Sequence, residues 1–135
     1  MVLDSKKARL KLGDSGEKVA ANYLIAQGYE IIAANFSNDK GYRLGEIDLV
    51  VKNKQGKLIF VEVKTRKNTK SDDNYGIFPE NAITPSKIKK LEKAVAVFLK
   101  LNGLMEVAWR IDAVAIIFNY VTRKVSIKHI KYIRI

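Results

Sequence analysis

Two short apolar segments, each with the composition of a buried strand, carry charged side chains. Asp48 lies in the first segment, residues 45–51, and Glu62 and Lys64 lie in the second, residues 58–64. An ionised carboxylate in an apolar strand is costly unless a cation or a hydrogen-bond donor compensates it. These charges need an explanation beyond folding, and a divalent-metal site provides one.

The turn between the two segments predicts which charged residues face each other. Asn53-Lys54-Gln55-Gly56 is a strong hairpin signal. A turn centred there pairs Asp48 with Glu62 on one face of the two strands. By the same register, Glu46 is opposite Lys64. Two opposed carboxylates with Cβ atoms about 5 Å apart repel each other unless a positive charge lies between them.

The residue types at this hairpin indicate which ion and which reaction to expect. Carboxylate oxygens and a backbone carbonyl suit Mg²⁺ or Mn²⁺, which keeps several waters and accepts substrate phosphate as a further ligand. Lys64 points the same way as Glu62, so it can hold an attacking water or stabilise charge on the phosphate. The pattern predicts metal-dependent phosphodiester hydrolysis.

The composition favours a polyanionic partner. The formal net charge is +11 over 135 residues, and such an excess binds nucleic acid through phosphate contacts. We expect DNA rather than RNA as the partner, and an anionic membrane surface is a weaker alternative because no separate basic amphipathic helix stands out. The basic residues expected to contact nucleic acid are Arg43, Arg66, Lys67, Lys87 and Lys90.

The length and the apolar pattern predict one domain, residues 1–135. The chain has no cysteine, which excludes disulfides and thiolate metal sites and fits a reducing compartment. The first residues lack the apolar core of a signal peptide, and no apolar run is long enough to span a bilayer. We therefore expect a cytoplasmic protein with no membrane partner.

Periodicity and turn signals predict the element order α-β-β-β-α-β-β, which is an α/β fold with a mixed sheet flanked by helices. Thr84 followed by Pro85 is a strong start for the second helix. The expected helices cover residues from about 14 to 27 and from 85 to 103, and the expected strands cover residues 29–36, 45–52, 57–66, 107–120 and 124–135.

The acid–acid–lysine pattern, together with this element order, resembles the PD-(D/E)XK nuclease superfamily. More closely, the chain is similar to the YraN family, which is related to archaeal Holliday junction resolvases. The resemblance covers residues from about 16 to 117. It is carried by Gly16-Glu17, Asn35-Phe36, Gly45-Glu46-Ile47-Asp48-Leu49, Phe60-Val61-Glu62-Val63-Lys64-Thr65-Arg66, Lys87 and Ile111-Asp112.

The resemblance implies a restriction-endonuclease-like fold and a role for each site residue. It implies that Asp48 and Glu62 are metal ligands and that Lys64 is the catalytic lysine. Glu17 matches the acidic residue that completes the metal or water shell in the resolvases. The implied substrates are branched DNA or recombination and repair intermediates, and the implied assembly is a homodimer.

Two other kinds of protein fit the same residues. A non-catalytic nucleic-acid-binding module would keep the fold and the basic surface, with Asp48 and Glu62 paired to Lys64 and Arg66. A subunit of a larger processing complex would bind its partner through a sheet edge. For Glu17, the alternative role is stabilisation of a helix dipole.

Three further polar residues have structural interpretations. Glu46 is expected to pair with Lys64 or Arg43 at a strand end. Asp112 lies in an apolar strand, where we expect it to accept a hydrogen bond from a neighbouring backbone group. His129, the only histidine, lies in a polar alternating segment and is expected at the surface.

Overall fold

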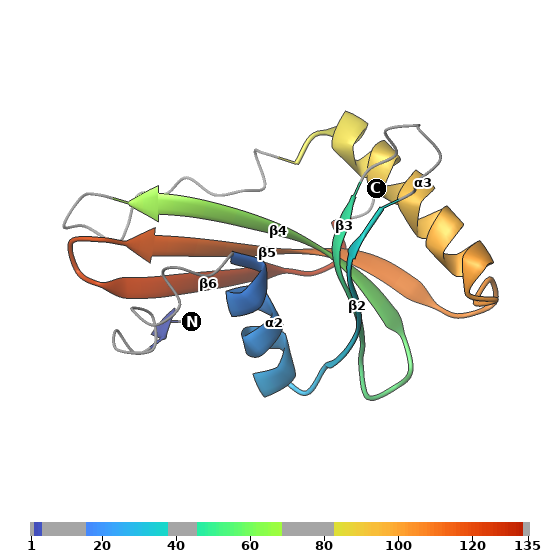
Figure 1. Ribbon diagram of the computed structural model, residues 1–135, viewed down its shortest axis with the longest axis horizontal. Coiled ribbons are helices and arrows are strands. Elements are labelled where there is room, and N and C mark those ends of the chain that lie inside the picture. Colours follow the sequence, from blue (N-terminus) through green and yellow to red (C-terminus); the bar gives the residue numbers. More distant parts are fainter. Residues whose placement is uncertain (1, 4–15, 38–45, 69–82, 134–135) are drawn as a thin grey trace.

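A computed structural model describes residues 2–3, 16–37, 46–68 and 83–133 of the chain (Figure 1). The helices and strands in chain order are β1 (Val2–Leu3), α2 (Gly16–Ala26), β2 (Glu30–Phe36), β3 (Ile47–Lys52), β4 (Leu58–Asn68), α3 (Pro85–Leu101), β5 (Trp109–Asn119) and β6 (Lys124–Ile130).

The six strands form one mixed sheet in the order β1-β6-β5-β4-β3-β2. Strands β4 and β5 are parallel, and every other neighbouring pair is antiparallel. The run from α2 to β5 is α-β-β-β-α-β, which confirms the predicted α/β, restriction-endonuclease-like fold. Strand β1 was not predicted. It is two residues long and forms one edge of the sheet by pairing with β6.

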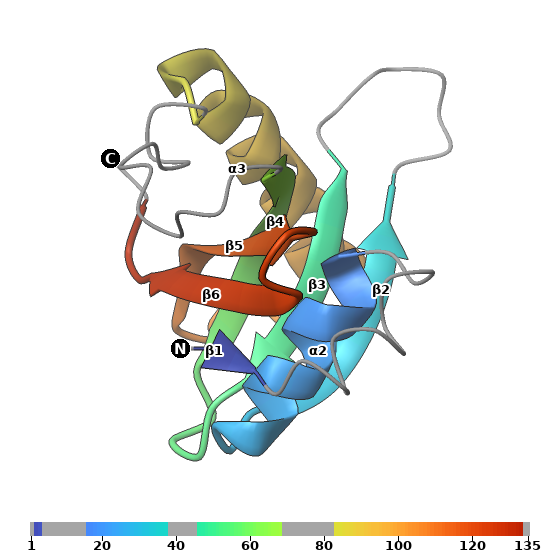
Figure 2. The same ribbon diagram turned by 90° about the vertical axis from the view of Figure 1, so that its left-hand side faces the viewer.

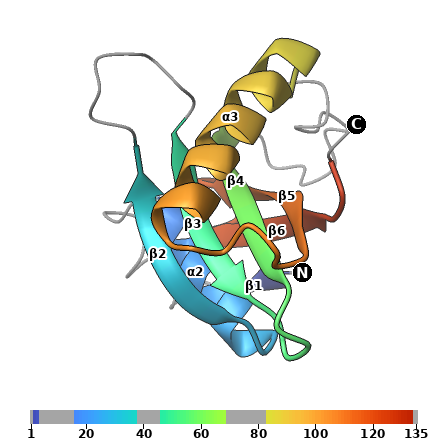
Figure 3. The ribbon, with the colours of Figure 1, turned by 90° about the vertical axis from the view of Figure 1, so that its right-hand side faces the viewer.

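The two helices cover opposite faces of the sheet. In Figure 2 α2 lies in front of the sheet, whereas in Figure 3 α3 lies in front and α2 behind. Neither helix is long and apolar enough to cross a membrane. Side-chain alternation along β3 and β4 makes this layering possible, because successive residues point to opposite faces.

Each helix packs on its own apolar core. On the α2 side, Leu24 is packed with Leu49 and Val61 of the central strands. On the α3 side, Phe98 is packed with Phe60, and their ring centroids are 5.5 Å apart in an edge-to-face arrangement. The central hairpin is therefore buried on both faces, which explains why its segments read as nearly continuous apolar runs.

Most predicted boundaries are close to those in the structure. Helix α3 begins at Pro85, and Thr84 is its N-cap, with Oγ1 accepting a hydrogen bond from Lys87 N at 3.2 Å. Strand β4 is longer than predicted because β5 pairs with it as far as Asn68. Strand β6 ends at residue 130, Tyr132 has a positive φ of 59°, and Ile133 N donates to Ile111 O of β5 at 2.8 Å.

Candidate active site

The β3–β4 hairpin has the predicted register and separates at Asp48. The partners run from Lys52–Leu58 at the turn to Leu49–Val61. Beyond that pair, Val63 N–H donates to Asp48 Oδ2 at 2.7 Å. The carboxylate of Asp48 therefore accepts a hydrogen bond from the backbone of β4 at the point where the backbone pairing of the two strands ends. This bond fixes the carboxylate beside Glu62.

The structure brings three of the predicted site residues, Asp48, Glu62 and Lys64, together in one cleft of about 290 Å³, and Glu17 is not among the residues that line it. Its floor is formed by Glu46, Asp48, Glu62 and Lys64 from the central hairpin, and its wall by Ile83 and the first turns of α3, with Lys87, Lys90 and Leu91. The two strand acids and the lysine thus face the same side of the sheet, as the alternation predicted.

Asp48 is in an environment that opposes its ionisation. Burial raises the pKa of its carboxyl group to about 7, although the bond from Val63 N–H acts in the opposite direction. The negative charges of Glu62, Glu17 and Glu46 add to the increase. Burial is therefore the main reason why ionised Asp48 is unfavourable, and the neighbouring carboxylates add to it.

Glu62 and Lys64 form an ion pair within the cleft. Lys64 Nζ lies 3.2 Å from Glu62 Oε1, and both side chains are mostly buried. Burial lowers the pKa of Lys64, but a hydrogen bond with Lys87 and the charge of Glu62 outweigh it, so the pKa is raised. The same contact with Lys64 lowers the pKa of Lys87. Lys64 is thus a cation placed between an acid and a second lysine.

The first turn of α2 brings Glu17 towards the same region. Glu17 is half-buried, and its charge contributes to the raised pKa of Asp48. The helix can begin this close to β4 because Gly16 has no side chain. A Cβ at Gly16 would overlap Thr65 Oγ1 and lie 3.1 Å from Thr65 Cβ.

The residues of the cleft fit a divalent ion that shares its ligands with substrate. Within the ranges that the structure describes, no three acidic or histidine side chains are grouped closely enough to enclose a metal. Mg²⁺ does not need such a cage, because it is commonly held by one or two carboxylates together with water and phosphate. Asp48 and Glu62 could supply those carboxylates, and the charge of the ion would offset the repulsion at Asp48.

The predicted nucleic-acid contacts divide into three groups. Lys87 and Lys90 line the cleft. Arg66 and Lys67 are exposed near the end of β4, where Lys67 Nζ lies 5.9 Å from the ring centroid of Tyr120. Arg43 falls outside the described residues.

The prediction for Glu46 is only partly tested. Its side chain lines the cleft, but Lys64 forms its ion pair with Glu62. The alternative partner, Arg43, lies outside the part of the chain that the structure describes.

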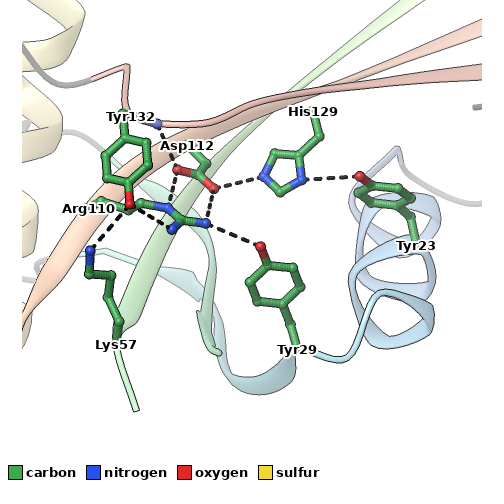
Figure 4. A network of polar contacts seen from close by, with 7 residues as sticks. All are labelled: Tyr23, Tyr29, Lys57, Arg110, Asp112, His129 and Tyr132. Carbon is green, nitrogen blue, oxygen red and sulfur yellow. Dashed lines mark hydrogen bonds and ion pairs between the residues drawn. The ribbon is translucent and has the colours of Figure 1, made fainter. Parts of the chain in front are cut away.

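A polar network that the sequence did not predict lies on the α2 side of the sheet (Figure 4). Asp112 accepts hydrogen bonds from Tyr132 N, as the backbone interpretation predicted, and also from Arg110 Nε at 2.9 Å. His129 Nε2 lies 2.7 Å from Asp112 Oδ2, and its side chain is only 6% exposed. The surface prediction for His129 was therefore wrong. The residue is covered because Tyr23, on a distant helix, packs against it.

The fold and the cleft define the class of protein: an α/β protein with a restriction-endonuclease-like core and acidic and basic side chains together at its central hairpin. Within this class, the chain belongs to the uncharacterised protein family UPF0102, the YraN family, whose model matches residues 16–116.

Relatives in the same family cover most of the chain. The UPF0102 protein of Trichlorobacter lovleyi is 39% identical over 113 residues, which are 84% of this chain and 82% of that protein. The UPF0102 protein of Roseiflexus castenholzii is 38% identical over 92% of this chain and 93% of its own.

A solved structure, Pyrococcus furiosus SfsA in complex with Ca²⁺, is a more distant match. It covers 91% of this chain, whereas this chain spans 63% of the SfsA chain, with 18% identity and a TM-score of 0.37.

Proposed function

We propose that this protein is a divalent-metal-dependent nuclease that hydrolyses phosphodiester bonds in DNA, with branched recombination or repair intermediates as its substrates. The observation that carries the proposal is the placement of Asp48, Glu62 and Lys64 in one cleft, where burial and neighbouring acids raise the pKa of Asp48 to about 7. A carboxylate that is destabilised in this way gains from binding a cation, and the basic residues beside it suit a phosphate backbone.

Asp48 and Glu62 would hold Mg²⁺ or Mn²⁺, and Glu17 would support this shell from α2. When bound, such an ion lowers the pKa of a coordinated water and polarises a phosphoryl oxygen. In the structure, Glu62 forms an ion pair with Lys64. With Glu62 engaged as a metal ligand, the ammonium group of Lys64 would be free to donate hydrogen bonds to the attacking water or to the phosphate.

The reaction assigned to this cleft is hydrolysis. A water oxygen forms a bond to phosphorus, the bond from phosphorus to one sugar oxygen breaks, and a proton passes from the water to solvent while the departing oxygen acquires one. Lys64 stabilises the negative charge that develops on the phosphate oxygens. Lys87 and Lys90, on the wall of the cleft, are placed to hold phosphates of the same strand.

The test is cleavage of branched and linear DNA of matched sequence in the presence of Mg²⁺ or Mn²⁺. We expect product with the unaltered protein, and none with chelator, with Asp48→Asn or with Lys64→Ala. Lys100→Ala is a matched control because Lys100 is exposed near the end of α3, away from the cleft. Equal product from all four proteins would refute the assignment.

A specific observation favours the non-catalytic nucleic-acid-binding module as the second candidate. The Glu62–Lys64 pair at 3.2 Å and the Val63–Asp48 bond at 2.7 Å each give a site acid a structural partner. Calorimetry with Mn²⁺ separates the two functions. DNA binding that is unaffected by Asp48→Asn, in a protein that binds no divalent ion, would favour the module.

A further inference from the structure

We propose that the protein has a second ligand site, a phosphate-binding cavity at the turn of the β3–β4 hairpin. The cavity has a volume of about 300 Å³ and is lined by residues 27–29, which follow α2, by turn residues 53–55, and by Arg110 and Lys131. It lies near the Lys52–Leu58 end of the hairpin, whereas the active-site cleft lies beyond the Leu49–Val61 end. Part of its lining comes from the residues after α2, whereas part of the lining of the active-site cleft comes from α3.

The charge of the lining favours an anion. Lys54, Arg110 and Lys131 all contribute to the cavity, and none of its lining residues is acidic. Lys54 and Lys131 are exposed, and among the described residues neither has an ion-pair partner. The charge of Arg110 is offset by its ion pair with Asp112, so Lys54 and Lys131 supply the unpaired positive charge at this cavity, which a bound phosphate would offset.

Arg110 is already fixed in position before any ligand binds (Figure 4). Its Nε and Nη2 groups donate to the two oxygens of Asp112, at 2.9 and 3.2 Å. Nη2 also donates to Tyr29 Oη at 3.2 Å, and Nη1 donates to Tyr132 Oη at 3.4 Å. These bonds use four of the five N–H donors of a guanidinium group and leave one on Nη1. A group held in this way loses little conformational entropy when it binds a ligand.

Asp112 is held in turn by His129. The polar network around Asp112, which lies outside the active-site cleft, thus has a role in this cavity. His129 Nε2 and Tyr132 N both contact the carboxylate, at 2.7 and 3.1 Å. These two contacts hold Asp112, whose two bonds from Arg110 set the orientation of the guanidinium group, and none of the four meets the ligand. Asp112 and His129 are therefore positioning residues for the cavity.

The turn that carries Lys54 is also well defined. Asn53 Oδ1 accepts hydrogen bonds from the backbone N–H groups of Gln55 and Lys57, at 3.0 and 2.9 Å. Gly28 leaves room for the lysine, because a Cβ there would lie 3.1 Å from Lys54 Cε, and its φ of 96° disfavours any other residue. Lys54 thus reaches across the end of α2 into the cavity.

The ligand is a phosphate group, either free or carried by a nucleic-acid strand. To test this, inorganic phosphate is titrated into the protein by calorimetry, followed by a short single-stranded oligonucleotide with and without a 5′-phosphate. The test variant is Lys54→Gln with Lys131→Gln. The matched control is Lys89→Gln with Lys93→Gln, which removes the same charge from exposed positions on α3.

We expect the test variant to bind phosphate at least about tenfold more weakly than the unaltered protein, since each lost lysine removes a charge-assisted contact, and the control to bind as the unaltered protein does. Backbone amide resonances of Gly28 and Lys131 should shift during the titration. Tighter binding of the 5′-phosphorylated oligonucleotide than of free phosphate identifies a strand end as the source of the phosphate. Equal affinity for the two identifies a small ligand.

Equal weakening in both double variants, or the absence of phosphate binding at millimolar concentrations, would overturn the proposal. The cavity is tested separately from the active site because Asp48→Asn, which is expected to abolish cleavage, should leave phosphate binding here unchanged.

Discussion

At Asp48, the requirements of stability and of the proposed metal binding oppose each other. Its pKa is raised to about 7, first by burial and then by the charges of Glu62, Glu17 and Glu46. The folded state therefore binds a proton at this carboxyl more tightly than the unfolded chain does. It follows that ionised Asp48 lowers the stability of the protein when no cation is bound.

We predict that Asp48→Asn stabilises the protein at pH 8 in the absence of divalent ions, by about 1–2 kcal/mol after allowance for partial solvent exposure. The gain should shrink as the pH falls from about 7 towards about 4, because folded Asp48 is then protonated in the unaltered protein. Urea unfolding at pH 5 and pH 8 measures the difference. Glu106→Gln, at an exposed position, is the control, and an equal effect of the two substitutions would contradict the explanation.

Asp112 has the opposite electrostatic environment. Burial alone would raise its pKa, but the hydrogen bonds from His129, Arg110 and Tyr132 outweigh burial, so the pKa is lowered. This carboxylate therefore stabilises the fold above its unfolded pKa of about 3.9, and the stabilisation is lost as the pH falls through the lower folded pKa.

We predict that Asp112→Asn costs about 3–5 kcal/mol at neutral pH, because it leaves the charge of the buried Arg110 without its partner. Below pH about 4 the cost should decline as Asp112 of the unaltered protein becomes protonated. Chemical unfolding between pH 3 and pH 7 tests both statements. A substitution that is neutral at pH 7 would show that the network contributes little.

At the scale of elements, the start of α2 and the strand β4 depend on each other. Gly16 is buried against Thr65, so the helix approaches the strand more closely than a side chain would permit. The same contact places Glu17, the next residue, near Asp48. Packing at this point should therefore affect both stability and the proposed cleavage.

We predict that Gly16→Ala destabilises the protein by about 1–3 kcal/mol through overpacking, and that it reduces cleavage by moving Glu17. Thr65→Ala should recover part of both losses, since it removes Oγ1 and Cγ2 from the contact. Thermal unfolding and cleavage rates of the two single variants and the double variant test this coupling. Additive losses in the double variant would rule it out.

Local sequence signals predicted the helices and strands well. Features that depend on contacts between residues far apart in the sequence were not predicted. The hairpin turn at residues 53–56 and the N-cap at Thr84 are encoded by neighbouring residues, and both lie where they were predicted. The facing of Asp48 and Glu62 followed from alternation and the turn. The burial of His129 did not, because it depends on Tyr23, which is 106 residues away in the chain. No periodic pattern links two such residues.

At the scale of the whole molecule, the net charge of +11 is the main reason to expect a nucleic-acid partner. The structure places part of this positive charge at the candidate active site, since Lys87 and Lys90 line the cleft that holds Asp48 and Glu62. DNA as the partner, a homodimer and a cytoplasmic location all stay predictions. Salt dependence can show whether the cleft lysines contact phosphates.

We predict that Lys87→Gln with Lys90→Gln reduces the slope of log K against log salt for DNA binding by about 1.4–1.8, the value for two lost phosphate contacts. Lys89→Gln with Lys93→Gln, which lie on α3 outside the cleft, should change the slope much less. Fluorescence anisotropy at several salt concentrations provides the values. If both double variants change the slope equally, net charge alone determines binding.

The central claim is that Asp48 and Glu62 share one divalent cation. The most direct measurement is the anomalous diffraction signal from crystals grown with Mn²⁺. We expect a single strong peak within about 2.0–2.3 Å of a carboxylate oxygen of each residue, and its loss in Asp48→Asn crystals. Crystals saturated with Mn²⁺ that show no peak between these two carboxylates would contradict this claim.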